Sequence, residues 1–451
     1  MSAGGGTGES AGCPGLLATD FYQLTMLQAY HQAGMREWAA FEFFCRRLPR
    51  SRGFLMAAGL ATLLERLETA RFSEAELEWL RGTERFPAEM IECFAAWRFT
   101  GDVYAAPEGT PVFPDEPLLR VEGPIAEAQL VETLVISQLH FQTLIASKAA
   151  RMVLAAPNTL LIDFGLRRAH SLEAGTYAAR AAYLAGFGGT ATVSAGMRFG
   201  IPVSGTMAHS FIQAHDSEEE AFRDFAEARP SDVVFLIDTF DTEAAARKVV
   251  KLAKPLRARR ITIRGVRIDS GDLAAHARAV RAILDEGGLR EVKIVASGGI
   301  DEWSLRGLAA APIDTFGIGT SLVTSQDSPA IDCAYKLVAY AGTPRRKRSE
   351  EKVLWPGAKQ VYRRYDPDGR LNHDVLTLAD EQLEGQPLLE LVMRGGRRLP
   401  QPTLEESRVA AAASLARLPI GLCDLDTPAA YRVDVSDGLR RLTATLEAKG
   451  R

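Results

Sequence analysis

Cysteine is scarce and scattered in this chain. Its 451 residues include five cysteines, at positions 13, 45, 93, 333 and 423, and no two of them form a CxxC pair. Disulfide-stabilised secreted domains are dense in cysteine, and zinc sites need ligands at short spacings. The sequence therefore argues against a disulfide framework and a zinc site, and we expect a reducing, cytoplasmic setting.

Long apolar runs and an excess of charge of one sign are also missing. No apolar stretch reaches the ~18 residues of a membrane span, and the net charge is −4. We therefore expect neither a membrane nor a nucleic acid as an obligate partner. The one basic run, Arg345–Arg348, is short enough for a solvated loop. Residues 1–15 are rich in Gly, Ser and Ala without a basic start, which predicts a disordered tail and not a signal peptide.

A repeated pattern occupies residues 265–322. Three segments there, GVRIDSGDL, EVKIVASGGI and DTFGIGTSL, begin as apolar strands and end in small polar residues. Between them, residues 273–284 and 302–310 carry apolar residues at helical spacing. Strand, polar turn and helix in repeated order are typical of a parallel sheet or an α/β barrel.

Four more candidate strands precede this region. They are Leu160–Asp163, Ala191–Ser194, Pro202–Gly205 and Val233–Asp238. Seven candidate strands, most followed by helical segments, favour an irregular (β/α) TIM-like barrel over an open sheet.

The chain on either side mixes helices and short strands, and a single long helix over 126–152 leads into the barrel. We predict a mixed N-terminal α+β domain over 16–150, the barrel as a catalytic domain over 151–330, and a C-terminal segment, 331–451, that returns to the N-terminal domain. Neither outer piece has enough residues for a comfortable core alone.

Charged and titratable groups follow the strands of this predicted barrel. In such folds the chemistry lies at the carboxyl ends of the strands, where the sequence places Arg167, His209, Asp238 and Asp269. Singly, these residues have structural interpretations: a surface charge, a hydrogen-bonded histidine or a helix cap. Their common placement at one face instead predicts a site.

Small residues follow the last three strands in the same way. Glycine turns let backbone N–H groups approach an anion, and Asp269 or Asp272 is suited to a metal or a ribose hydroxyl. From the residues alone, we predict a sugar phosphate with Mg²⁺ as the ligand.

Five motifs follow one another along the chain in an order that is typical of one protein family. They are TDFYQLTM (19–26), DFGLRRAH (163–170), GTMAHSF (205–211), RIDSGDL (267–273) and FGIGTSLVTS (316–325). Together they closely resemble the nicotinate phosphoribosyltransferase family from about residue 16 onward. The resemblance implies a homodimer in which an irregular α/β barrel is joined to an α/β domain made from both chain ends.

The activity that the resemblance implies is a step of NAD salvage. Nicotinate is joined to 5-phosphoribosyl 1-pyrophosphate (PRPP), giving nicotinate mononucleotide and pyrophosphate, with Mg²⁺ as the metal. ATP is a co-substrate, and its hydrolysis is coupled through a phosphorylated histidine.

The resemblance also assigns roles to residues. His209 becomes the phosphorylated histidine, Phe164 and the partner's Tyr22 stack on the pyridine ring, and Arg167 lies beside the ring and the pyrophosphate. Arg267 and Asp269 contact the ribose and PRPP, and Asp269 is the candidate Mg²⁺ ligand. Further nicotinate and PRPP contacts are expected from Thr190, Ser270 and Gly271. The 5′-phosphate cradle is expected from Ser297, Gly298, Gly299, Gly317, Gly319 and Thr320.

Related activities are the first alternatives. The relative that acts on nicotinamide carries an aspartate in a GTDTV segment, whereas this chain has GTATV with Ala191 in that place. An aspartate there would repel a carboxylate, so Ala191 favours nicotinate over nicotinamide. Quinolinate phosphoribosyltransferase shares the fold, but its chain is shorter and lacks the GTMAHS histidine.

Two alternatives come from other classes. A (β/α)₈ sugar-phosphate isomerase or aldolase would need a lysine or glutamate at a strand end, and no strand end clearly supplies a lysine. In a non-catalytic, ligand-sensing barrel, His209 and Asp269 would be dispensable.

Overall fold

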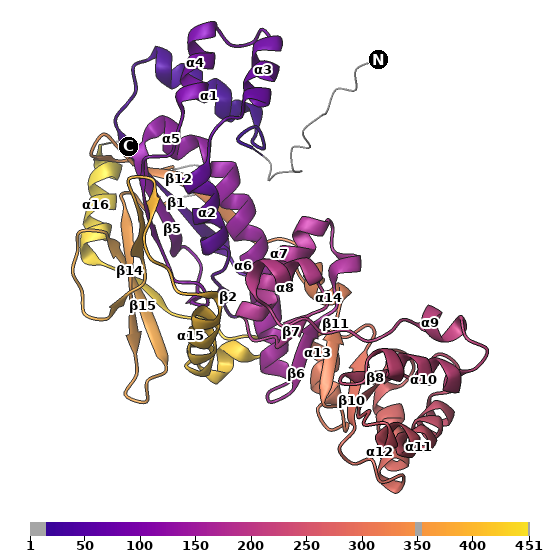
Figure 1. The fold of residues 1–451 in the computed structure, drawn as a ribbon. Helices are drawn as coiled ribbons and strands as arrows, with labels where there is room; N and C mark the ends of the chain where they lie inside the picture. Colours follow the sequence, from indigo (N-terminus) through magenta and orange to yellow (C-terminus); the bar gives the residue numbers. More distant parts are fainter. Residues whose placement is uncertain (1–14, 348–353, 450–451) are drawn as a thin grey trace, which may run out of the picture.

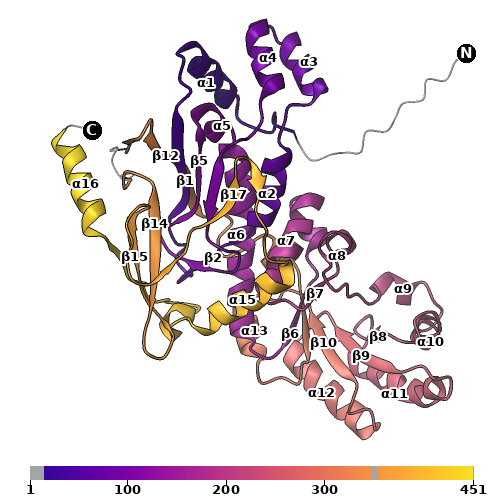
Figure 2. The same ribbon diagram turned by 60° about the vertical axis from the view of Figure 1, so that its left-hand side comes forward.

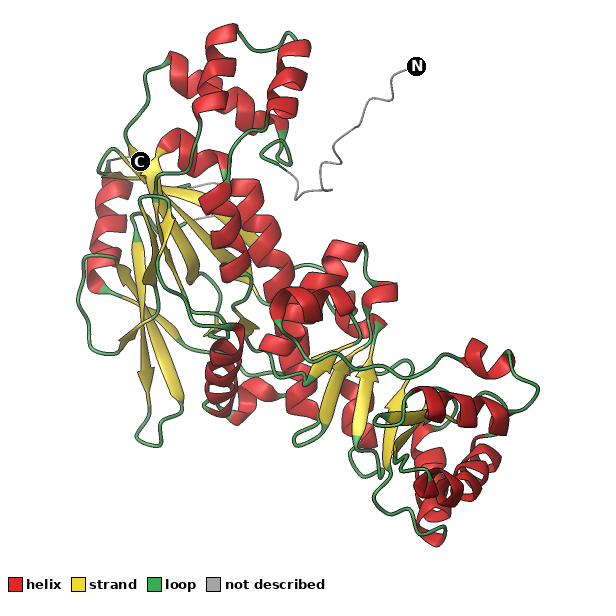
Figure 3. Ribbon diagram, viewed as in Figure 1, coloured by secondary structure: helices red, strands yellow, loops and turns green. Residues whose placement is uncertain are grey.

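The computed structural model describes residues 15–347 and 354–449. The tail predicted over 1–15 falls almost wholly outside these residues, as do Cys13 and Arg348. The described chain is a mixed α/β structure in which helices cover two large sheets (Figures 1 and 3). One of these sheets is antiparallel and the other is parallel.

Strands from both ends of the chain build the seven-stranded antiparallel sheet, whose order is β13-β12-β1-β5-β3-β17-β18. The central strand β1 pairs with β5 on one side and with β12 on the other. Strand β17 pairs with β3, so segments that follow residue 330 flank strands from the first 125 residues. The bounds are β1 (Trp38–Arg47), β3 (Asp102–Ala105), β5 (Pro117–Pro124), β12 (Asp332–Tyr340), β13 (Thr343–Pro344), β17 (Glu390–Arg394) and β18 (Arg397–Arg398).

Six helices accompany the N-terminal strands. In α2, Leu60, Leu63, Leu64 and Leu67 recur at helical spacing and are all buried, which is why this helix packs on the sheet. Helices α1, α3 and α4 cluster at one end of the molecule, away from the parallel sheet (Figures 1 and 2). The bounds are α1 (Phe21–Gln32), α2 (Leu60–Thr69), α3 (Glu74–Gly82), α4 (Ala88–Ala96), α5 (Ile125–Leu130) and α6 (Glu132–Ala155); strands β2 (Leu55–Met56) and β4 (Pro111–Val112) form a small ladder.

Helix α6 connects the two halves of the molecule. Its earlier residues, Leu139 and Leu144, lie in the hydrophobic core of the antiparallel sheet. Its later residues, Ile145 and Ala149, share a second core with Phe316 of the parallel sheet. The helix therefore fixes one sheet relative to the other.

A buried cluster of ion pairs strengthens this connection. Lys148 Nζ lies 2.5 Å from Glu302 Oε2 and 2.9 Å from Asp327 Oδ1. Arg151 Nε lies 3.0 Å from Glu302 Oε1, and Arg52 Nη2 lies 3.1 Å from Asp327 Oδ1. Because buried charges are costly unless they are paired, all five groups hold one another in place.

The rest of the C-terminal segment forms a four-stranded sheet of order β16-β14-β15-β19. Its central pair, β14 and β15, is antiparallel, and β19 joins β15 in parallel. Thr403 and Glu406 form a capping box that starts α15. The bounds are β14 (Lys359–Tyr365), β15 (Leu371–Leu378), β16 (Gln386–Pro387), β19 (Val433–Val435), α15 (Leu404–Ala416), the 3₁₀ helix η2 (Ile420–Cys423) and α16 (Asp437–Ala448).

The six-stranded parallel sheet has the order β7-β6-β11-β10-β9-β8. The first and last strands of this sheet in chain order, β6 and β11, are neighbours, as they are in a barrel. The strand bounds are β6 (Leu160–Asp163), β7 (Gly189–Thr190), β8 (Val233–Leu236), β9 (Ile263–Ile268), β10 (Lys293–Ser297) and β11 (Thr315–Ile318). The helix bounds are η1 (Leu166–Arg168), α7 (Leu172–Leu184), α8 (Val193–Phe199), α9 (His209–Gln213), α10 (Glu218–Ala228), α11 (Thr242–Ala258), α12 (Leu273–Glu286), α13 (Glu302–Leu308) and α14 (Thr320–Val323).

This sheet is a curled half-barrel. Val203 forms an isolated parallel bridge with Thr190 of β7, and in the described chain no strand pairing joins Val203 to β8. An opening therefore separates the two edges of the sheet. The loop 204–208 follows Val203 and leads to α9.

Three predicted elements differ in the structure. The strand predicted over Ala191–Ser194 is wrong: β7 ends at Thr190, whose Oγ1 accepts from the Thr192 backbone N–H at 2.9 Å, and α8 begins at Val193. The strand predicted over 202–205 shrinks to the Val203 bridge. The long helix over 126–152 is two helices, α5 and α6, that meet at Val131.

None of the helices in the described part of the chain combines the length and the hydrophobicity of a membrane span.

Candidate active site

His209 lies at the opening between the two edges of the half-barrel. Its Nδ1 is 3.1 Å from Thr239 Oγ1, and its Nε2 is 3.9 Å from Asp269 Oδ2. The nearby Arg267 donates from Nη1 to Thr206 Oγ1 at 2.7 Å, which ties the 204–208 loop to β9. The imidazole side chain is 38% exposed, so it is both held and accessible.

Two carboxylates meet beside His209. Asp238 Oδ2 accepts from the backbone N–H of Asp269 at 3.0 Å and from Ser270 Oγ at 2.5 Å. The other oxygen, Asp238 Oδ1, is buried and has no hydrogen-bond partner among the described residues. Asp269 Oδ1 accepts from the hydroxyl of Ser297. The loops after β8, β9 and β10 are thereby joined into one cluster.

Positive charge acts on the same cluster. Burial lowers the pKa of Arg267, the carboxylates of Asp269 and Asp238 oppose that shift, and the positive charge of Arg167 lowers the pKa again. Arg167 is exposed on η1, within electrostatic reach of Arg267. Two guanidinium groups and two carboxylates therefore surround the strand ends.

The glycine turns after β10 and within β11 bring backbone close to these groups. Gly298 and Gly299 have φ angles of +96° and +64°, which glycine adopts without steric cost. A Cβ on Gly298 would lie 2.1 Å from the carbonyl oxygen of Asp269, and one on Gly317 would lie 2.4 Å from the Phe164 ring. Only glycine permits both approaches.

A hydroxyl links the two turns. Ser321 of α14 donates its hydroxyl to the carbonyl oxygen of Ile300, which follows the Gly298–Gly299 turn. Gly319 is the N-cap of α14, and Thr320 is the first residue of that helix and is exposed. The predicted phosphate-cradle residues thus lie in the last residues of β10 and β11 and in the connected segments that directly follow these strands.

The ends of β6 and β7 form the neighbouring wall. Asp163 accepts from Gly165 N at 2.8 Å and from Thr190 Oγ1 at 2.7 Å. Burial raises the pKa of Asp163, and these hydrogen bonds oppose the shift. Phe164 donates its backbone N–H to Ile318 O at 2.7 Å. This backbone bond ties Phe164 to β11, and its half-buried ring lies against Gly317.

The structure thus brings the predicted barrel residues to one end of the sheet, whereas Tyr22 lies elsewhere. Helix α1, which carries Tyr22, is at the far end of the molecule from the half-barrel (Figures 1 and 2). The Tyr22 side chain is exposed on α1, and its hydroxyl donates to Glu132 at 3.2 Å. Within one chain, Tyr22 does not join the site.

Three residues in the site received no role from the sequence: Asp163, Thr206 and Thr239. Each is a polar residue at or shortly after a strand end, and this position is the feature of the sequence that could have identified it as a site residue. Nothing local indicates, however, that Thr206 bonds Arg267 or that Thr239 faces His209, because these contacts join segments far apart in the sequence.

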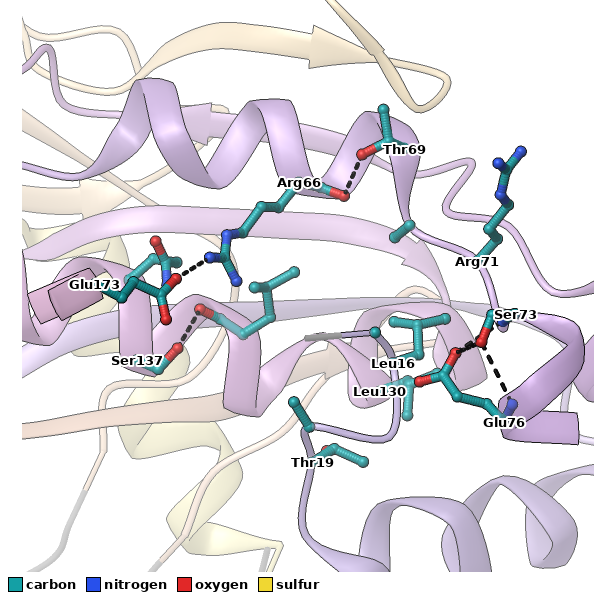
Figure 4. A pocket seen from close by; sticks show the side chains of 15 residues that line it. Leu16, Thr19, Arg66, Thr69, Arg71, Ser73, Glu76, Leu130, Ser137 and Glu173 are labelled. Carbon is teal, nitrogen blue, oxygen red and sulfur yellow. Dashed lines mark hydrogen bonds and ion pairs between the residues drawn. The ribbon is translucent and has the colours of Figure 1, made fainter. Parts of the chain in front are cut away.

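A cavity of about 590 Å³ is lined by residues before α1, at the end of α2 and at the start of α7 (Figure 4). Its polar groups include Arg66, which bonds Glu173 at 2.5 Å, and the Ser73–Glu76 capping box. The predicted site residues all belong to the described chain, and none of them lines this cavity. The cavity therefore shares no lining residue with the predicted site.

The donor atoms of the site suit a hard divalent cation that is shared with a substrate. Across residues 15–347 and 354–449, no cluster of three or more His, Cys, Asp or Glu side chains forms a metal cage. Mg²⁺, however, usually keeps several waters and binds through one or two carboxylates plus substrate phosphates. The unpartnered Asp238 Oδ1 and the carboxylate of Asp269 supply such oxygens, so the residues fit Mg²⁺.

The fold and the site together define a class of protein. It is an α/β protein whose charged groups, glycine turns and candidate phosphate contacts meet at the carboxyl ends of a curled parallel sheet, where such folds bind small molecules.

Comparisons with known proteins then identify the family. Models of nicotinate phosphoribosyltransferase (NAPRTase) match the chain in three parts: the N-terminal domain at 17–140, the NAPRTase family at 159–343 and the C-terminal domain at 383–443. This chain belongs to the nicotinate phosphoribosyltransferase family.

Relatives cover nearly the whole chain. It is 50% identical over 428 residues to the nicotinate phosphoribosyltransferase pncB2 of Mycobacterium tuberculosis, a match that covers 94% of this chain and 92% of the relative. It is 41% identical over 386 residues to the nicotinate phosphoribosyltransferase of Bacillus subtilis, covering 83% of this chain and 78% of that one. The crystal structure of human nicotinic acid phosphoribosyltransferase superposes with a TM-score of 0.86 at 30% identity, over 95% of this chain and 99% of the human one.

Proposed function

We propose that this family member condenses nicotinate with PRPP in NAD salvage, giving nicotinate mononucleotide and pyrophosphate, and that phosphorylation of His209 couples ATP hydrolysis to the reaction. One observation carries the proposal. His209, Asp269 and Arg267 meet the glycine turns at one end of the parallel sheet, in a chain that is 50% identical over 428 residues to a nicotinate phosphoribosyltransferase.

The transfer step needs positioning more than a protein nucleophile. As pyrophosphate leaves C1 of the ribose, positive charge develops on the ring and negative charge on the leaving group. The guanidinium of Arg167 stabilises the leaving pyrophosphate, and Arg267 with Asp269 positions the ribose. The nicotinate nitrogen then forms the new bond to C1 while the C1–O bond to pyrophosphate breaks.

His209 is suited to accept a phosphoryl group. When Nδ1–H donates to Thr239 Oγ1, the lone pair of Nε2 is free to attack the γ-phosphorus of ATP. The N–P bond forms as the bond to ADP breaks. Water later removes the phosphoryl group, which drives an otherwise unfavourable condensation forward.

Asp238 and Asp269 are the residues that would hold Mg²⁺. When bound, this cation neutralises charge on the phosphates of the substrates.

Selection of nicotinate over nicotinamide is assigned to the end of β7. Ala191 is exposed there, and its backbone N–H donates to Asp163 O at 2.7 Å. A methyl side chain adds no negative charge where a carboxylate substrate approaches.

We also propose that the protein is a homodimer and that each site is completed by a residue of the partner chain. Tyr22 is exposed on a distant helix, so a partner chain in a homodimer supplies it to stack on the pyridine ring opposite Phe164. The 204–208 loop, tied by Thr206 to Arg267, supplies the wall that completes an irregular TIM-like barrel. The working compartment is the cytoplasm.

One assay tests the proposal. Enzyme, PRPP, Mg²⁺ and ATP are incubated with nicotinate or nicotinamide in separate reactions, and the mononucleotides are quantified by chromatography. We expect nicotinate mononucleotide, with a faster rate when ATP is present. Product from nicotinamide alone, or none from either base, would refute the assignment.

A further inference from the structure

A thiol, an imidazole and a carboxylate meet in the helical cluster at the far end of the molecule from the half-barrel. Cys93 Sγ of α4 lies 3.6 Å from His31 Nδ1 of α1. The other ring nitrogen, His31 Nε2, lies 2.9 Å from Glu89 Oε1, one helical turn before Cys93. This order of nucleophile, base and orienting carboxylate is the arrangement that activates a cysteine.

The contacts fix the proton positions. A carboxylate only accepts hydrogen bonds at neutral pH, so Glu89 holds the proton of His31 on Nε2. The lone pair of Nδ1 then faces the Cys93 thiol and can take its proton. The Glu89 side chain is 75% exposed, so it orients the ring and adds little to stability.

The thiol opens onto a small cavity. Cys93, His31 and Arg36 line a space of about 120 Å³ whose other walls are mostly apolar, among them Met35, Met90 and Trp97. An aromatic or aliphatic group fits these walls, and Arg36 adds a positive charge that suits an anionic substituent.

The position of Cys93 within α4 favours one reaction of the thiol, disulfide exchange, over another, acyl transfer. Acyl transfer needs N–H donors for an oxyanion, but Cys93 is the sixth residue of a nine-residue helix, where backbone N–H groups bond within the helix. Exchange with a disulfide needs no oxyanion site, since the charge remains on sulfur.

We propose that Cys93, His31 and Glu89 form a second reactive site, which undergoes thiol–disulfide exchange with low-molecular-weight disulfides that carry an apolar or aromatic group. His31 takes the proton from Cys93, and the thiolate attacks one sulfur of the disulfide. The new S–S bond forms as the old one breaks, and the leaving thiolate receives the proton from His31. The sulfur of Cys93 is oxidised, and the released sulfur is reduced.

The other described thiols provide internal standards. Burial raises the pKa of Cys45 to about 12 and that of Cys333 to about 11. Burial also raises the pKa of Cys423, which is half-buried as Cys93 is. These three thiols should therefore react slowly, because the thiolate is the nucleophile.

The test uses the full chain with Cys13→Ala, which removes the thiol that lies outside the described residues. The protein is mixed with dithiobis(nitrobenzoate), an aromatic anionic disulfide, and the mixed disulfides are located by peptide mass mapping over time. We expect Cys93 to react at least about tenfold faster than Cys423. Equal rates for the two thiols would overturn the proposal, and this comparison needs no change at the site.

Variants of His31 and Glu89 test whether Cys93 reacts fast because His31 activates it or only because the thiol is accessible. His31→Gln should slow Cys93 by about tenfold because an amide cannot take the proton, and Glu89→Gln should slow it less. The matched control is His373→Gln, which alters a histidine 4.0 Å from the Asp434 carboxylate on the C-terminal sheet and should leave the Cys93 rate unchanged. An undiminished rate in folded His31→Gln would overturn the role of His31. Cys93→Ser should form nicotinate mononucleotide as the parent does, so the two proposals can fail separately.

Discussion

His209 Nδ1 lies 3.1 Å from Thr239 Oγ1 across the opening of the half-barrel. The histidine follows the loop after Val203, whereas the threonine follows β8 at the other edge of the sheet. One hydrogen bond therefore both bridges the opening and fixes which ring nitrogen of His209 faces the site.

Removing the imidazole should uncouple ATP from the condensation. We expect His209→Ala to lose the acceleration by ATP while the chain stays folded, because alanine offers no nitrogen to accept the phosphoryl group. The measurement is the rate of nicotinate mononucleotide formation with and without ATP, beside a circular dichroism spectrum. ATP stimulation that persists in the folded variant would contradict the phosphohistidine.

Thr239 should act through His209. Thr239→Val removes the hydroxyl but keeps the shape, and losing one hydrogen bond of about 1 kcal/mol predicts an ATP-stimulated rate about fivefold lower. Thr239→Ser keeps the hydroxyl and serves as the control. The label transferred from γ-³²P-ATP to the protein should fall in the valine variant only. Equal labelling in both variants would show that the contact has no part in the coupling.

A negative charge at Ala191 should weaken the use of nicotinate. Ala191→Asp places a carboxylate near the proposed substrate carboxylate, and we expect kcat/KM for nicotinate to fall at least about tenfold. Ala191→Asn has nearly the same volume without the charge, so it should lose less. Steady-state kinetics with both bases measures the effect, and identical values for the two variants would assign the loss to size and not to charge.

The buried ion cluster should be costly to break. Lys148→Met leaves the buried carboxylates of Glu302 and Asp327 short of one cation, and we expect the free energy of unfolding to fall by about 3 kcal/mol. Lys293→Met is the control, since its pair with Asp314 is exposed and should contribute less than about 1 kcal/mol. Urea denaturation compares the two variants. Equal losses would mean that burial adds nothing to the Lys148 pairs.

Acid should weaken the same cluster. Burial favours the neutral form of Asp327, but Arg52 and Lys148 outweigh this effect and lower its pKa to about 2. Because the folded pKa lies below the unfolded value of about 3.9, the stabilisation is full above that value and is lost as the pH falls toward about 2. Urea midpoints measured across this range should fall less steeply for Asp327→Asn than for the parent chain. Parallel slopes would rule out this carboxylate as a source of the acid sensitivity.

The sequence predicts the individual strands and helices of the half-barrel better than it predicts whether the strands close into a barrel. The apolar strands and the polar turns after them are local signals, and β6, β9, β10 and β11 lie where the pattern places them. The predicted Ala191–Ser194 strand is wrong: the segment contains the β-branched residues Thr192 and Val193, but the hydrogen bonds of Asp163 and Thr190 end β7 at Thr190. Tertiary contacts overrode the local preference.

In the site, too, local sequence features predict which residues take part, whereas the contacts between them depend on the tertiary structure. The residue types at the strand ends and the family motifs predict His209, Asp269 and the glycine turns as site residues. The contacts that orient them do not follow from spacing, because Thr239 and Asp238 reach them from other segments. Nor does the sequence reveal the opening between Val203 and β8, which depends on which strand edges pair.

The pairing of β1 with β12 has a consequence for synthesis. Strand β1 leaves the ribosome early, but its second edge stays uncovered until residues 332–340 emerge. All strands of the half-barrel, from β6 to β11, precede β12 and can assemble first. A nascent chain interrupted between them would therefore carry a finished parallel sheet beside an exposed, aggregation-prone strand edge.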